Sequence, residues 1–286
     1  MIKITEKYFD LKQICDSGQC FRMREIAEQR YGIVAFGKYL EMEQTKDGVF
    51  FFCSESEFEA IWKAYFDLNM NYGDIINGIG KEDAYLLTAA QYGSGIRILH
   101  QDLWEMMVSF IISQQNHIKR IRKCIETICE RFGEKKIDKN GMVYFDFPTP
   151  KALAEAGEEN LRACNLGYRS RYLDKTAKQV IERGDLEDFQ SMTYEQARKK
   201  LMEFCGIGEK VADCICLFAL QKKEAFPIDV HIKRVLEEQY PKGFPFERYR
   251  DNAGILQQYI FYYDLTKKEN KGSILHKDEK VSYNKK

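Results

Sequence analysis

The sequence predicts an α+β fold in which an N-terminal antiparallel β-sheet lobe precedes a mostly α-helical domain. Short β-rich segments with turn signals between them fill the first 60 residues. Apolar residues then recur at helical spacing through most of the remaining chain. Gly93-Ser94-Gly95 separates the two regions, so we place the lobe at residues 1–95 and the helical domain at 96–266. At about 150 residues per domain, 286 residues agree with two domains or one large one.

Within the lobe, strands are expected at residues 29–36, 39–44 and 49–53, separated by Gly37 and by a Lys-Asp-Gly turn. A helix is expected to follow, with Ser56 as its N-cap. These strands are consecutive and joined by short turns, so we expect them to pair antiparallel.

The helical domain begins with a broad apolar face over residues 102–112. A second helix is expected from Ile118, with Asn116 as its N-cap. Residues 141–150 are expected to form a loop, and two or three further helices fill residues 151–200.

Composition restricts the class of protein. The chain is 44% hydrophobic and 31% charged, with 19 Gly and 5 Pro, which excludes a collagen-like or low-complexity chain. Basic and acidic residues number 44 each, so any surface for a polyanion must be a local patch. The lysine-rich residues 267–286 are expected to form a disordered tail.

Cysteine usage and hydropathy indicate an intracellular protein. Nine cysteines are an odd number, and Lys3, Glu6 and Lys7 interrupt any secretory apolar segment, so we expect reduced thiols. No pair forms a CxxC motif, and we expect no bound metal cluster. The longest apolar runs fall far short of about 20 residues, so we expect no membrane span.

Residues 201–216 predict a helix-hairpin-helix. An amphipathic helix ends near Gly206-Ile207-Gly208, and a second helix starts at once. The two glycines permit a sharp turn and leave backbone N–H groups uncovered beside a helix N-terminus, where a phosphate of a nucleic-acid backbone binds well. Gly206 and Gly208 are therefore candidate DNA-phosphate contacts.

Lys210 and Asp229 are the candidate catalytic pair. Lys210 lies in the first turn of the second helix, where the helix dipole favours the neutral, nucleophilic amine. The alternative role is a phosphate contact. Asp229 begins a further helix, and its alternative role is an N-cap. Together an amine and a carboxylate suit a Schiff base with a sugar carbon and the cationic sugar that forms as a glycosidic bond breaks.

The sequence resembles the helix-hairpin-helix DNA glycosylases, and within them the 8-oxoguanine DNA glycosylase/AP lyases. The resemblance follows family order over about 250 residues and rests on these segments: 17–22 (SGQCFR), 113–117 (SQQNH), 147–150 (FPTP), 166–172 (LGYRSRY), 205–220 and 253–261 (AGILQQYIF). It implies that Lys210 attacks the sugar carbon and that Asp229 assists.

The resemblance also implies how a flipped base is read. Phe261 and Cys214 would stack on the base, and Gln257 would bond its Watson–Crick edge. The Gly18 carbonyl would accept the N7–H that 8-oxoguanine has and guanine lacks. Taken alone, Phe261 is more often a core residue than a stacking surface, and Cys214 is ordinarily a small buried core residue. Gln258 is an alternative to Gln257.

For the partner strand, the resemblance implies that Arg120 and Arg169 read cytosine and that Tyr168 wedges the base stack. Gln115 takes the position where the family has an asparagine, so we expect weaker preference for cytosine. His231 is a candidate phosphate contact, with surface exposure as the alternative.

We therefore expect a bifunctional enzyme that excises 8-oxoguanine from double-stranded DNA, opposite cytosine, and cleaves the strand by β-elimination. It is expected to act as a monomer in a bacterial cytoplasm, without a cofactor or a membrane partner. A structural monovalent or divalent cation at the 205–208 hairpin stays open. The alternatives are a noncatalytic helix-hairpin-helix DNA-binding module and a glycosylase of the same fold acting on another damaged base.

Overall fold

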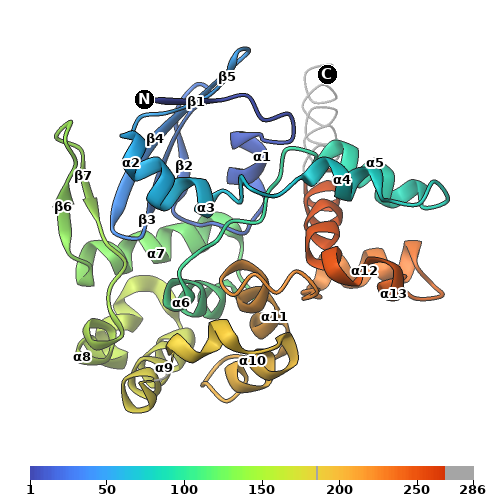
Figure 1. The fold of residues 1–286 in the computed structure, drawn as a ribbon. Helices are drawn as coiled ribbons and strands as arrows, with labels where there is room; N and C mark the ends of the chain where they lie inside the picture. The colour runs from blue at the N-terminus through green and yellow to red at the C-terminus, as the bar shows by residue number, and fades with distance from the viewer. Residues whose placement is uncertain (185, 268–286) are drawn as a thin grey trace, which may run out of the picture.

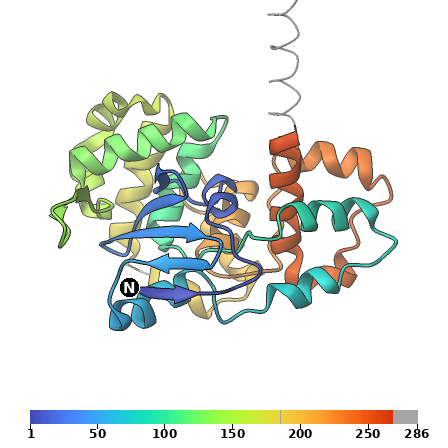
Figure 2. The same cartoon turned by 90° about the horizontal axis from the view of Figure 1, so that it is seen from above.

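The structure, a computed structural model, describes residues 1–184 and 186–267. Figure 1 shows the N-terminal sheet above and beside a larger set of helices. Seen from above in Figure 2, helices lie on both sides of the sheet lobe. In these two ranges no helix combines the length and the apolar character needed to cross a lipid bilayer. The predicted tail falls on residues 268–286, outside the described ranges, apart from residue 267.

The sheet lobe is a five-stranded antiparallel sheet, as the sequence predicts. Its strand order is β1-β5-β4-β3-β2. The strands are β1 (Ile2–Ile4), β2 (Met23–Ala27), β3 (Arg30–Ala35), β4 (Lys38–Thr45) and β5 (Gly48–Phe51). The three predicted strands correspond to β3, β4 and β5, whereas the sequence analysis did not identify β1 and β2. β1 pairs with β5, joining Ile2 to Phe51 across nearly 50 residues.

The lobe has its own apolar core between the sheet and two helices. These helices are α1 (Leu11–Asp16) and a continuous helical segment made of α2 (Glu55–Glu57), a π turn (Phe58–Trp62) and α3 (Lys63–Tyr65). Ile14, Trp62 and Phe51 are all fully buried there. The N-cap of α2 is Ser54, not Ser56, because the Ser54 hydroxyl accepts from Glu57 N at 3.2 Å and the helix begins before Ser56.

The remaining chain is mostly helical and encloses a second, larger core. Its helices are α4 (Tyr72–Asn77), α5 (Ala84–Tyr92), α6 (Leu103–Ser113), α7 (Ile118–Phe132), α8 (Pro150–Leu161), α9 (Arg169–Arg183), α10 (Tyr194–Leu201), α11 (Glu209–Phe218), α12 (Val230–Gln239), α13 (Phe246–Tyr249) and a C-terminal helix over residues 253–267. α8, α9 and α10 are the helices expected between residues 151 and 200. α6 lies near the middle, and all nine of its residues from Trp104 to Ile112 are buried.

The C-terminal helix packs beside α4 and α5, which come from a distant part of the sequence (Figures 1 and 2). Tyr85 lies 5.8 Å from Tyr263 between ring centroids, and Tyr92 lies 5.7 Å from Tyr262. Residues 72–92 thereby contribute to the larger core rather than to the core of the sheet lobe. Where the two predicted domains divide along the chain stays a prediction.

Two local predictions in this half of the chain are wrong. The N-cap of α7 is His117, whose Nδ1 accepts from Arg120 N at 3.3 Å. Asn116 instead donates through Nδ2 to Ile112 O at 3.2 Å, because it closes the end of α6. The expected loop at residues 141–150 contains β7 (Val143–Phe145), which pairs with β6 (Lys135–Ile137) in a small hairpin.

Candidate active site

One cavity of about 750 Å³ gathers predicted site residues from five separate parts of the chain. The residues of the predicted set that line it are Gly18, Gln115, Gly208, Lys210, Asp229, His231 and Phe261. A second cavity, of about 410 Å³, lies between the sheet lobe, α7 and the β6–β7 hairpin, and none of the predicted residues lines it. The larger cavity is therefore the candidate active site.

The hairpin between α10 and α11 forms one wall of the cavity. Gly206 has φ +82°, and a Cβ there would lie 2.7 Å from Tyr172 Cβ, so both the backbone and the packing require glycine. Gly208 caps α11 without a side-chain hydrogen bond, and open space lies over its Cα. The first N–H groups of α11 have no intrahelical acceptor, so this wall offers donors to an anion.

The hairpin is fixed from behind by hydrogen bonds to its carbonyl groups. Thr176 Oγ1 donates to Cys205 O at 2.6 Å, and Gln114 Nε2 donates to Gly206 O at 2.9 Å. Gln114 belongs to the segment after α6 that also lines the cavity, so it joins two walls of the site. In the described ranges, His, Cys, Asp and Glu side chains nowhere form a group of three or more able to hold a metal ion.

Lys210 reaches into the cavity from the first turn of α11. Its Nζ lies 5.3 Å from the centroid of the Phe110 ring of α6, and Phe110 also lines the cavity. Cys214 follows one turn later, is 3% exposed and does not line the cavity. Burial raises the pKa of the Cys214 thiol to about 11, against the opposing effect of the Lys210 ammonium beside it. The thiol is therefore neutral near neutral pH. Because Lys210 lines the cavity and Cys214 does not, Lys210 is the stronger candidate nucleophile.

Asp229 faces the cavity from the N-terminus of α12 and is also an N-cap. Its Oδ1 accepts from His231 N at 3.0 Å and from Ile232 N at 2.9 Å. Within residues 1–184 and 186–267 no ion pair within 4.0 Å joins Asp229 to Lys210, although both line the same cavity. The capping role of Asp229 is therefore confirmed, and its catalytic role stays a prediction.

The base-recognition residues divide into those on the cavity wall and those behind it. Gly18 and Phe261 lie on the wall in direct proximity, since a Cβ at Gly18 would be 3.1 Å from Phe261 Cε1. Gln257 lies one turn before Phe261 on the same helix, is 3% exposed, and donates through Nε2 to Pro227 O at 2.9 Å. Gln257 and Cys214 do not line the cavity, and their contacts with a base stay predictions.

The four residues predicted for the partner strand meet at the α6–α7 and α8–α9 connections. Tyr168 is 45% exposed, and the Arg169 guanidinium lies 4.6 Å from the centroid of its ring. Arg169 is itself 5% exposed and donates to Gln114 O and Gln115 O. Arg120 donates through Nη2 to Asn165 O at 3.2 Å. Both arginines therefore bond backbone carbonyls and must exchange these partners to read a base.

Sequence reasoning missed several residues that shape the site. Phe110 lies under Lys210, and Asp264 accepts from His231 Nδ1. Lys119 is a second lysine on the cavity wall. Asp264 had a usable signal, because it follows Phe261 by three residues on one helix and so shares its face. The other two gave no local signal.

A helix-hairpin-helix whose second helix presents a lysine to a cavity that an aspartate also lines defines a base-excision DNA glycosylase. The comparisons agree. The model described as "8-oxoguanine DNA glycosylase, N-terminal domain" matches residues 1–107, and the model for the HhH-GPD superfamily of base excision DNA repair proteins matches residues 108–242. The chain belongs to the 8-oxoguanine DNA glycosylase family of that superfamily.

Relatives are found in several kingdoms. A probable N-glycosylase/DNA lyase of Methanothermobacter thermautotrophicus is 30% identical over 68% of this chain and 71% of its own. An N-glycosylase/DNA lyase of Saccharomyces cerevisiae is 37% identical over 51% of this chain, which spans only 42% of the yeast protein. The structure of the Clostridium acetobutylicum 8-oxoguanine glycosylase/lyase, solved with DNA containing cytosine opposite 8-oxoguanine, has a TM-score of 0.86 and 34% identity, and the match covers 94% of this chain and 99% of that one.

Proposed function

We propose that this chain is a bifunctional DNA repair enzyme that excises 8-oxoguanine from duplex DNA and then cleaves the strand. The observation that carries the proposal is the single cavity of about 750 Å³ that Lys210 and Asp229 line together with Gly18 and Phe261. A noncatalytic DNA-binding module would explain the hairpin, but it has no need of an amine and a carboxylate in one cavity.

The chemistry follows from these two groups. The neutral Lys210 amine attacks the anomeric carbon of the sugar as the bond to the base breaks, and the base departs with the bonding electrons. The Asp229 carboxylate stabilises the positive charge that develops on the sugar, and two N–H groups of α12 hold the carboxylate in place. The resulting amine adduct opens the sugar to an imine. Loss of a proton from the adjacent carbon then expels the 3′ phosphate, which is the β-elimination step.

Recognition requires the damaged nucleotide to leave the base stack, because the anomeric carbon and the base edge are hidden in the duplex. The cavity is wide enough for a base, with Phe261 as a stacking surface and Gly18 near its ring. Gln115, exposed and with φ +48°, stands at the edge where the vacated space in the stack would lie. Cytosine opposite the lesion would accept hydrogen bonds from Arg120 and Arg169. The two arginines would then release the backbone carbonyl groups that they bond now.

We further propose that the enzyme acts as a monomer, without a cofactor, in the cytoplasm of a bacterium. All nine cysteines are free and eight are buried, which suits a reducing compartment. Gel filtration with light scattering tests the monomer. Activity that survives exhaustive treatment with a metal chelator supports the absence of a required metal, and loss of thermal stability on the same treatment would instead reveal a structural cation at residues 205–208.

A strand-cleavage assay tests the proposed function. A short duplex with one 8-oxoguanine opposite cytosine is incubated with the protein, and products are resolved with and without alkali. Nicking without alkali shows both activities, whereas nicking only after alkali shows base release alone. Binding without either product would support the noncatalytic module, and release of an alkylated base in preference to 8-oxoguanine would support the other glycosylase.

A further inference from the structure

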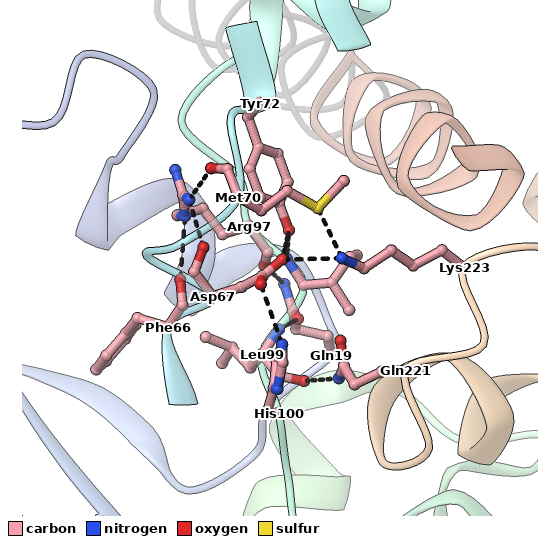
Figure 3. A network of polar contacts seen from close by, with 11 residues as sticks. Gln19, Phe66, Asp67, Met70, Tyr72, Arg97, Leu99, His100, Gln221 and Lys223 are labelled. Carbon is pink, nitrogen blue, oxygen red and sulfur yellow. Dashed lines mark hydrogen bonds and ion pairs between the residues drawn. The ribbon is translucent and has the colours of Figure 1, made fainter. Parts of the chain in front are cut away.

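The Gln19 side chain holds the chain around Gly18 in place through hydrogen bonds to Ser17 and to residues 97–99. Gln19 is fully buried, and its Nε2 donates to Ser17 Oγ and to Arg97 O, each at 2.9 Å. Its Oε1 accepts from Leu99 N at 2.9 Å. One amide therefore bonds the residue before Gly18 and ties the residue after it to the segment 97–101 between α5 and α6. Figure 3 shows Gln19 beside Arg97 and Leu99 of this segment. All three of these hydrogen bonds are buried, so the Gln19 side chain is held in one orientation.

The segment that Gln19 holds is itself immobilised. Arg97 is fully buried and donates to four carbonyl groups, those of Tyr8, Phe66, Asp67 and Met70. Its guanidinium also lies 4.2 Å from the centroid of the Tyr72 ring, and Tyr72 OH accepts from Ile98 N. A buried arginine with this many partners is costly to displace. Gln19 is therefore attached to a rigid support, as Figure 3 shows.

Gly18 lies between Ser17 and Gln19 and has a left-handed backbone conformation. Its φ is +76°, and it packs so closely on Phe261 that a Cβ would lie 3.1 Å from the ring. Among the described residues, no donor bonds the Gly18 carbonyl. A carbonyl on the cavity wall without a protein donor is available to a ligand, and its direction depends on the peptide planes at Ser17 and Gln19.

We propose that Gln19 is a positioning residue that sets the direction of the Gly18 carbonyl and thereby the selection of 8-oxoguanine. This inference rests on the proposed function, in which that carbonyl accepts the N7–H of the damaged base. Gln19 touches neither the base nor Lys210. Its loss changes the reading of the base and leaves the chemistry at the sugar intact.

The test separates base reading from chemistry by comparing two duplexes. One contains 8-oxoguanine opposite cytosine, and the other contains a preformed abasic site opposite cytosine, which Lys210 can cleave without any base to read. Gln19→Met keeps the length of the side chain and removes all three of its hydrogen bonds. Gln221→Met is the matched control, because Gln221 donates to Leu99 O at 3.1 Å, on the same buried segment, without contacting residues 17–19. Ser17→Ala is a milder variant that removes one of the three bonds, together with the bond from Ser17 Oγ to Ile14 O at 2.8 Å.

We expect the single-turnover rate on 8-oxoguanine to fall about tenfold or more in Gln19→Met, which corresponds to loss of about 1.4 kcal/mol. Cleavage of the abasic duplex stays within about twofold. Ser17→Ala shifts the ratio of the two rates in the same direction by less, and Gln221→Met leaves it unchanged. An unchanged ratio in both Gln19→Met and Ser17→Ala, or an equal loss on both duplexes, overturns the inference. A wild-type protein that cleaves abasic DNA but does not release 8-oxoguanine refutes the proposed substrate itself.

Discussion

Asp264 on the C-terminal helix holds the imidazole of His231 at the edge of the cavity, with 2.8 Å between Asp264 Oδ2 and His231 Nδ1. Asp264 is also paired with Arg234 on α12. The Phe261 ring lies edge-on to the imidazole, 5.6 Å between centroids. A carboxylate that accepts from Nδ1–H fixes the ring and leaves Nε2 for another partner. A phosphate beside the damaged nucleotide suits a cavity for DNA, and because a phosphate only accepts, Nε2 bonds it as the donor of a protonated ring.

Replacement of His231 should therefore weaken DNA binding in a salt-dependent way. We expect His231→Gln to bind lesion DNA less tightly and, if the imidazolium is the bound form, to reduce the slope of log K against log salt by about 1. Fluorescence anisotropy over a range of salt concentrations measures the slope. Lys233→Gln is the control, since Lys233 is exposed on the same helix and does not line the cavity. Identical binding by wild type and His231→Gln at every salt concentration would show that His231 is an uninvolved surface residue.

Replacing one carboxylate oxygen of Asp229 by an amide nitrogen separates its capping role from its proposed catalytic role. Asp229→Asn retains an oxygen to accept from His231 N and Ile232 N, so the melting temperature should change by less than about 2 °C. The catalytic rate should fall about 100-fold or more, because the neutral amide no longer stabilises the cationic sugar. Calorimetry and single-turnover kinetics provide the two measurements.

Asp102→Asn is the matched control, because Asp102 caps α6 in the same way, through Glu105 N at 2.8 Å. It should leave the rate unchanged. If Asp229→Asn loses stability and keeps its rate, the residue is an N-cap alone.

The choice of partner base should depend on Arg120. Its guanidinium is exposed and donates to Asn165 O at 3.2 Å, so it can turn to a cytosine at small cost. Arg120→Ala should lower the preference for cytosine by about 1–3 kcal/mol while barely changing release opposite cytosine. Because Gln115 is longer and more flexible than asparagine, the wild-type preference is itself expected to be modest.

Single-turnover excision opposite each of the four bases measures this preference. Arg131→Ala, in the last turn of the same helix, is the control. Coincident profiles for wild type and Arg120→Ala would leave Arg120 as a helix-surface or phosphate-contacting residue.

Cys214 should resist alkylation near neutral pH. Burial raises the pKa of its thiol to about 11, and the neutral thiol is the less reactive form. Because the pKa of an acid is raised in the fold, this group favours the folded state below its ordinary value of 9.0, and the contribution disappears as the pH rises through about 11. Mass spectrometry after iodoacetamide treatment should find Cys205, the less buried cysteine, modified first. Rapid labelling of Cys214 with loss of activity would contradict this view of the site.

The sequence predicts the parts of the fold that depend on local periodicity. β3, β4 and β5 are β-rich runs of four to eight residues bounded by turn signals, and α6 and α7 repeat apolar residues at helical spacing, so each carries its own signal. β1, β6 and β7 have three residues each, too few for a period, and β1 pairs with a strand nearly 50 residues away. Such pairing is decided by the assembled lobe rather than by the segment.

The residues of the candidate site likewise divide into those that a local motif reveals and those that only the fold brings together. Gly206, Gly208 and Lys210 lie in one short motif, and the structure places the hairpin and the lysine at one cavity wall. The support of His231 by Asp264 joins residues 33 positions apart, and the Gln114 bond to the hairpin spans 92 positions. No local pattern reports these contacts. The predicted caps at Ser56 and Asn116 failed because each helix begins at a neighbouring residue, with Ser54 and His117 as the N-caps.

The central claim is that Lys210 forms a covalent bond with the damaged strand, and borohydride trapping tests it most directly. Lys119 offers a rival amine on the same cavity wall, so Lys210→Gln and Lys119→Gln form a matched pair. With 8-oxoguanine duplex and borohydride, wild type and Lys119→Gln should yield a covalent protein–DNA complex. Lys210→Gln should yield none and release no base, yet bind the duplex with similar affinity, because phosphate contacts supply most of the binding energy. A trapped complex and base release at the wild-type rate in Lys210→Gln would contradict the account.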